Sequence, residues 1–422
     1  MALEFLPTEL RILILQQLPD IQSLKSLVHA SPVYYSTFAL SKKSLLHDIL
    51  QRQYGLVDLA EPIAAIRSQG LHADIPANKT EIVNLLDRRR RHGELPASEQ
   101  GPADLEECIR LSHFYRQLEC LLDTYCAQAS CPPGVSQETW DQNRPINPSK
   151  TEKARILRAL CRLQTYCNIF GPREWSEEQQ QQQNTAAFSS PSYSPLKRRS
   201  SSWYRNFGLH EMWGMIFGTM PPWEVEEFGC LWVFLQQQYT EIFSEIAQEF
   251  PRNSHEWQAL RPTVDGMELF PSVDGDGSDG NDYNDYRNHL VSLGPSFLYK
   301  VLRQPSYEAR RNLVACNAIS SKSSFMILVK VSRDPPSLLY PADKYESEDI
   351  GRTLPLMPAI EQPNSGWKHH WHGYGPIHRV REVVRNDNPQ EPQIERTIGN
   401  AAGWQWGYAI WDEERNAAGH RL

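Results

Sequence analysis

The first helix expected in this chain is apolar around most of its circumference. From Thr8 onward, six apolar side chains follow within eleven residues, at Leu10, Ile12, Leu13, Ile14, Leu15 and Leu18. A helix on the surface of a globular protein usually carries a single apolar stripe, so this helix must be covered on two sides. We expect one side to pack against the next two helices of its own domain and the other side to bind a partner protein.

The sequence that follows predicts two more helices, which complete a three-helix unit. The second helix, which Asp20 or Ser23 can cap, carries three apolar residues, Leu24, Leu27 and Val28. Ser31 can cap the third helix, with Pro32 at its first position. We expect three aromatic side chains of this helix to point inward, those of Tyr34, Tyr35 and Phe38. A unit of about 40–45 residues is close to the lower limit for independent folding, so a partner would stabilise it.

Residues 6–18 resemble the opening of the F-box, L-P-x-E-L-x-x-x-I-L-x-x-L. The matched positions are Leu6, Pro7, Glu9, Leu10, Ile14, Leu15 and Leu18. The continuation over residues 19–35 looks like the fungal variety of the motif. It departs from the common form, because Ala30-Ser31-Pro32-Val33-Tyr34 stands in place of a Cys/Ser-Arg-x-Trp segment.

This resemblance implies a substrate receptor of a Skp–cullin–F-box ubiquitin ligase. Such a protein docks on the Skp adaptor, reaches the cullin through it, and recruits a protein substrate, which this sequence does not identify. The residues implied to bind the adaptor are Leu6, Pro7, Leu10, Ile14, Leu15 and Leu18, with Leu24 and Leu27 in support. Ubiquitin transfer would belong to the partners, so the chain would be a non-enzymatic adaptor without a cofactor, in the cytoplasm, the nucleus or both.

Two alternative functions stay open at this point. The chain could be an F-box scaffold that binds the Skp adaptor outside the ligase, and it would then not co-purify with cullin. It could also be an enzyme whose site lies in the aromatic C-terminal region around residues 369–372. A metal or ligand bound to the purified protein would favour the enzyme.

Composition limits the remaining partners. The net charge of −8 disfavours a general nucleic-acid binder, which needs a basic surface. No stretch approaches the ~18 apolar residues of a membrane-spanning helix, and Glu4, Glu9 and Arg11 interrupt the region where a signal peptide would be apolar. The eight cysteines form no C-x-x-C pair, which suits a reducing compartment. We therefore expect neither a nucleic-acid nor a membrane partner.

Periodicity predicts a mainly α fold, in which the three-helix F-box is followed by a helical body with long irregular loops. The expected regions are an F-box domain at 1–50, a helical region at 51–176, a disordered low-complexity insert at 177–202, a second helical region at 203–331 with an acidic loop at 252–288, and an irregular aromatic-rich region at 332–422 that packs on the body.

Within the body, the apolar spacing predicts individual elements. Helices are expected at 54–69, 80–91 with Thr80 as N-cap, 104–126, 150–170, 223–250 with Pro221-Pro222 at its start, 288–303 and 307–319, with a strand at 325–331.

No motif for catalysis or metal binding satisfies its structural requirements. Residues 275–280 match G-x-G-x-x-G, but the surrounding aspartates would repel a phosphate. His369, His370 and His372 lack Cys or Asp partners at metal-site spacing, so we interpret them as solvated loop residues. The sequence contains no nucleophile motif. We therefore expect no catalytic residue and no metal site.

Overall fold

The computed structural model describes residues 3–96, 99–132, 135–174, 202–249, 282–317, 340, 342–345, 350–358, 361–372 and 401–412. Every regular element in these ranges is a helix, which confirms the predicted mainly α class. The expected strand at 325–331 lies outside the described residues, as do all of the insert expected at 177–202 except residue 202 and most of the acidic loop. In the described part, none of the helices has the apolar length that a bilayer crossing requires.

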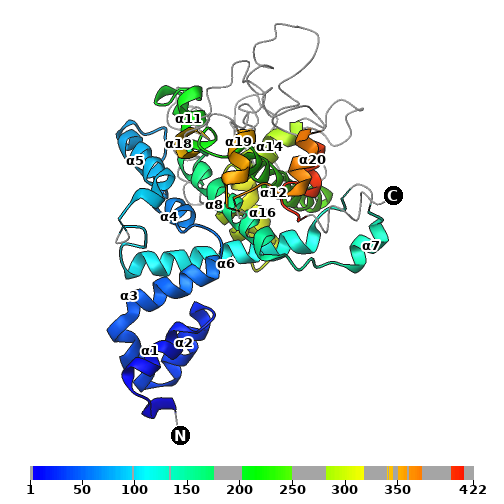
Figure 1. Ribbon diagram of the computed structural model, residues 1–422. Helices are drawn as coiled ribbons and strands as arrows, with labels where there is room; N and C mark the ends of the chain where they lie inside the picture. The colour runs from blue at the N-terminus through cyan, green and yellow to red at the C-terminus, as the bar shows by residue number, and fades with distance from the viewer. Residues whose placement is uncertain are drawn as a thin grey trace, which may run out of the picture.

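Residues 3–40, here called the N-terminal unit, lie at one end of the molecule (Figure 1). Its elements are the 3-10 turn η1 (Leu3–Phe5) and the helices α1 (Thr8–Gln16), α2 (Ile21–Ala30) and the first half of α3 (Pro32–Tyr54). Asp20 caps α2 by accepting a hydrogen bond from the Ser23 backbone N–H at 2.6 Å, and Ser31 caps α3. Both caps are predicted by the sequence, with Asp20 chosen over Ser23.

The aromatic residues of α3 depart from expectation. Tyr34 is buried, Phe38 is partly buried, and Tyr35 is exposed. The prediction for Tyr35 is wrong because its side chain points about 100° away from that of Tyr34 around the helix, on a side of α3 where it stays 60% exposed.

Helix α3 joins the N-terminal unit to the body. It kinks at Ser41, whose φ is −133° and ψ is 24°, and then continues past residue 50 to Tyr54, where it packs on α6. The expected domain boundary at residue 50 therefore falls inside a helix. The packed helix fixes the direction in which the N-terminal unit leaves the body (Figure 1).

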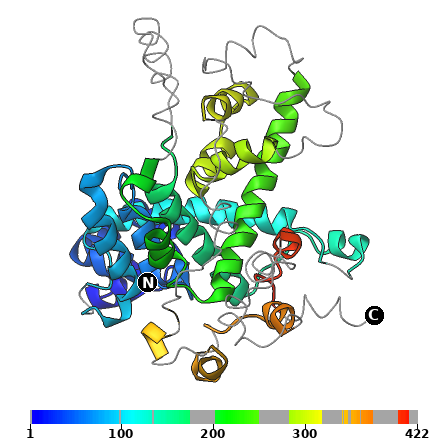
Figure 2. The ribbon, with the colours of Figure 1, turned by 90° about the horizontal axis from the view of Figure 1, so that it is seen from above.

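The body is a bundle built around α8 and α12, which pack against each other. Figure 2 shows α12 as the long green helix that runs through the body. Its helices are α4 (Ala60–Arg67), α5 (Lys79–Arg90), α6 (Leu105–Gln128), α7 (Gln137–Gln142), α8 (Lys150–Phe170), α11 (Leu209–Ile216), α12 (Pro222–Glu249), α14 (Asp282–Val291), α15 (Pro295–Leu302), α16 (Tyr307–Asn317), α18 (Ala342–Tyr345), α19 (Ile350–Thr353), α20 (Ser365–His372) and α22 (Ala401–Trp406). The remaining 3-10 turns are η2 (Pro76–Asn78), η3 (His92–Glu94), η4 (Ser202–Arg205) and η5 (Leu354–Leu356).

Two predicted helices are each divided by a glycine in the left-handed region. The helix expected at 54–69 is the end of α3 and the separate α4, with Gly55 at φ +62° after α3. The helix expected at 288–303 is α14 followed by α15, with Gly294 at φ +95° between them. A side chain at residue 294 would also collide with Gln164, because a Cβ there would lie 2.8 Å from its Nε2.

Other boundaries differ from the prediction in smaller ways. Asn78, not Thr80, precedes α5, and α14 begins at Asp282 inside the expected acidic loop. The C-terminal region was expected to be irregular, but α20 and α22 are helices. Asn364 starts α20 by accepting a hydrogen bond from the Trp367 backbone N–H at 2.8 Å, a local capping signal that apolar spacing does not reveal.

A continuous hydrophobic core runs through the described chain, from Leu15 in the N-terminal unit to Trp411 near the C-terminal end. In the body its centre is aromatic. The ring of Tyr166 on α8 lies 5.8 Å from that of Phe217 and 5.9 Å from that of Phe228 on α12. The body is therefore held together by long-range packing between helices that are distant in sequence.

Candidate functional site

Exposed large apolar side chains are concentrated on the N-terminal unit. Nine such residues are exposed in the described chain, and six of them lie in this unit, at Leu3, Phe5, Leu10, Leu13, Tyr35 and Leu40. Exposed apolar groups that gather on one small region of a soluble protein mark an interaction surface. The N-terminal unit is thus the candidate site for binding another protein.

Helix α1 has one buried side and one exposed side. Leu15 is fully buried in the core of the unit, and Arg11 donates a hydrogen bond from Nη1 to the Val33 carbonyl at 3.4 Å. Leu10 and Leu13, three residues apart, are 46% and 52% exposed, and at 100° per residue they share the opposite side with Gln17. The N-terminal unit itself covers the buried side, and the other side remains open.

The residues expected to bind an adaptor separate into three groups. Pro7 and Leu10 are exposed, whereas Leu6, Ile14, Leu18 and Leu27 are partly buried. Leu15 and Leu24 are buried. Leu24, which was expected to support the contact residues, is buried in the core of the unit. Leu15 was expected to contact the partner. This needs correction, because its side chain is fully buried in the core and has no surface left for a partner.

Five exposed apolar residues of the unit are not among those expected to bind the adaptor, namely Leu3, Phe5, Leu13, Tyr35 and Leu40. Leu13 could have been included, because it is one of the six apolar residues that surround the first helix. The other four stand outside the matched motif positions, and only the fold shows that they are exposed.

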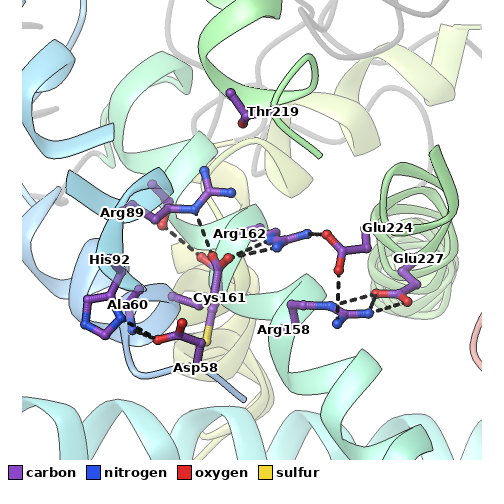
Figure 3. A network of polar contacts seen from close by, with 12 residues as sticks. Asp58, Ala60, Arg89, His92, Arg158, Cys161, Arg162, Thr219, Glu224 and Glu227 are labelled. Atoms are coloured by element: carbon purple, nitrogen blue, oxygen red, sulfur yellow. Dashed lines mark hydrogen bonds and ion pairs between the residues drawn. The ribbon is translucent and has the colours of Figure 1, made fainter. Parts of the chain in front are cut away.

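A second notable cluster is the buried ion network, which lies inside the body (Figure 3). It contains three carboxylates and three guanidinium groups from four helices, those of Glu61, Arg89, Arg158, Arg162, Glu224 and Glu227. Arg162 on α8 lies 2.8 Å from Glu61 on α4 and also pairs with Glu224 on α12. The formal charges cancel, as a buried cluster requires.

Electrostatics in this network favour the ionised form of Glu61. Burial alone would raise the pKa of Glu61, but the positive charges of Arg162 and Arg89 outweigh it and hold that pKa at about 2. Burial raises the pKa of Glu227 despite its pairing with Arg158. Each carboxylate is engaged by an arginine, so the network ties α4, α5, α8 and α12 together, which is a structural role.

The aromatic C-terminal segment, residues 401–412, is part of the core. The Trp411 ring stacks on Tyr125 of α6 at 5.3 Å. The Asp412 carboxylate accepts hydrogen bonds from Thr151 Oγ1 at 2.7 Å and Arg155 Nη1 at 2.6 Å at the start of α8. The segment therefore packs against α6 and is tied by hydrogen bonds to the start of α8.

The histidines at 369, 370 and 372 lie on helix α20, so their expected placement on a loop is wrong. Across the described residues, no group of three or more His, Cys, Asp and Glu side chains is arranged to hold a metal ion.

The chain was compared with family models, with curated proteins and with solved structures, and nothing matches.

Proposed function

We propose that the chain is a non-enzymatic F-box adaptor, which binds a Skp-type adaptor protein through its N-terminal unit and recruits a protein substrate to a cullin ubiquitin ligase. The observation that carries the proposal is the open side of α1. Leu10 and Leu13 are about half exposed within the segment that resembles the F-box. Burying an apolar side chain completely stabilises a complex by about 1.5–3 kcal/mol, so this surface has enough to gain from a partner.

The body would then present the substrate. Its helices share a core with the N-terminal unit, and α3 runs from one into the other. A substrate bound to the body would be held in a defined direction relative to the adaptor. The substrate class stays open in this proposal.

The decisive experiment measures binding of the full chain to a fungal Skp adaptor by pull-down and by titration. We expect the wild-type chain to bind, and the double variant Leu10→Asp, Leu13→Asp to bind at least about 100-fold more weakly, because two buried contacts are lost and two charges are desolvated. A matched control replaces Leu56 and Ile109, which are similarly exposed but lie outside the unit, with Asp. Circular dichroism verifies that both variants fold.

The proposal would be contradicted if the wild-type chain did not bind the Skp adaptor. It would also be contradicted if the Leu10→Asp, Leu13→Asp variant bound as tightly as the wild type. Cullin in the wild-type complex distinguishes a ligase subunit from a scaffold that binds the Skp adaptor alone.

A further inference from the structure

The turn η1, which precedes α1, displays its apolar side chains to solvent. No side chain of Leu3–Phe5 is buried. Phe5 is 83% exposed, more than any other exposed large apolar residue in the described chain, and Leu3 is also exposed. Packing against the rest of the chain therefore does not explain why this turn is ordered.

Two hydrogen bonds to the start of α3 hold η1 in place. Ser31 Oγ donates to Glu4 Oε1 at 2.5 Å, and Tyr34 Oη donates to the Leu3 carbonyl at 3.4 Å. Ser31 and Tyr34 are both buried, so their polar atoms have a defined position. Fixing a backbone segment costs conformational entropy, and here polar contacts offset that cost while the apolar side chains remain uncovered.

We propose that Glu4 is a positioning residue, which uses its hydrogen bond with Ser31 to hold Phe5 as an aromatic anchor for the Skp-type adaptor. This inference rests on the proposed function. Only Leu6 and Pro7 separate η1 from α1, so Phe5 stands directly before the helix whose open side carries the proposed contact. An exposed aromatic ring on a pinned backbone loses little freedom when it is buried by a partner, which is the property of an interface anchor.

The test is a double-mutant cycle, with the dissociation constant of the full chain and a fungal Skp adaptor measured by calorimetry. We expect Phe5→Ala to weaken binding about tenfold and Glu4→Ala about three- to fivefold. Glu4→Gln should bind like the wild type, because its amide oxygen still accepts the Ser31 hydrogen bond. If Glu4 acts through Phe5, the double variant Glu4→Ala, Phe5→Ala should bind no more weakly than Phe5→Ala alone. Leu356→Ala, at an exposed leucine remote in sequence, is the matched control.

The possible outcomes separate clearly. Wild-type binding that Phe5→Ala leaves unchanged would overturn the inference while the proposed function stands. The inference would also be overturned if Glu4→Ala weakened binding by the same factor in the wild type and in the Phe5→Ala variant, because Glu4 would then act independently of Phe5. Failure of the wild type to bind would overturn both proposals. Light scattering could instead show that the wild-type chain is a dimer and that the Phe5→Ala variant is a monomer. That result would assign the anchor to a second copy of the chain and overturn the inference.

Discussion

Glu61 illustrates how single residues in this protein depend on distant partners. It lies on α4, and its carboxylate is shared by Arg89 of α5, at 3.0 Å, and Arg162 of α8. The paired arginines lower its pKa from an ordinary 4.5 to about 2. Because the folded pKa lies below the unfolded value, the ionised carboxylate contributes stability that is complete above about pH 4.5 and is lost as the pH falls toward 2.

We therefore expect Glu61→Gln to lower the free energy of unfolding at pH 7 by about 3–5 kcal/mol, since it leaves buried guanidinium groups without their carboxylate. The variant should also lose less stability than the wild type between pH 4.5 and pH 2. Urea denaturation across this pH range measures both effects. The control is Glu99→Gln, because Glu99 pairs with Arg88 at the exposed surface, and we expect a change of less than about 1 kcal/mol there. Parallel pH profiles of wild type and Glu61→Gln would contradict the assignment.

Between elements, the approach of α22 to α12 depends on one small residue. A Cβ on Gly229 of α12 would collide with the indole ring of Trp404 on α22. We expect Gly229→Ala to lower the free energy of unfolding by about 1–3 kcal/mol, because the overpacked contact must open. A urea titration measures the change.

The control for this contact is Gly214→Ala. A Cβ on Gly214, inside α11, meets nothing within 4 Å, so alanine should be neutral or stabilising by up to about 1 kcal/mol. Equal effects of the two substitutions would show that helix propensity, not the Trp404 contact, governs residue 229.

For the whole molecule, the C-terminal segment 401–412 completes the core that begins with the earlier helices. Trp411 is fully buried, stacks on Tyr125 and meets Trp140 of α7 edge-on at 6.4 Å. We expect Trp411→Ala to cost about 3–5 kcal/mol, as large-to-small changes in a core do. The loss should lower the unfolding midpoints measured by far-ultraviolet circular dichroism and by tryptophan fluorescence together, because the core is continuous. A shift in fluorescence alone would mean that the segment unfolds separately from the body.

The helices with local signals could be predicted from the sequence. Residues 150–170 were expected as one helix, and α8 has those bounds, because Ser149 and Glu152 form a capping box at its start and its apolar residues repeat at helical spacing. Asp20 and Ser31 likewise mark the starts of α2 and α3. Caps and periodicity involve residues within about four positions of each other, so local sequence is enough to predict these elements and the mainly α class.

The candidate site was predictable only in part, because local signals do not reach the distant residues that cover it. The sequence placed an apolar surface on the first helix, but the separation of buried Leu15 from exposed Leu13 depends on how α1 packs on α3. Glu4 and Ser31 are 27 positions apart, and Glu61 and Arg162 are 101 positions apart. Burial and ion pairing at such separations depend on how whole helices pack, so the side chains that are paired inside, and those that remain open to a partner, become known from the three-dimensional arrangement and not from the sequence.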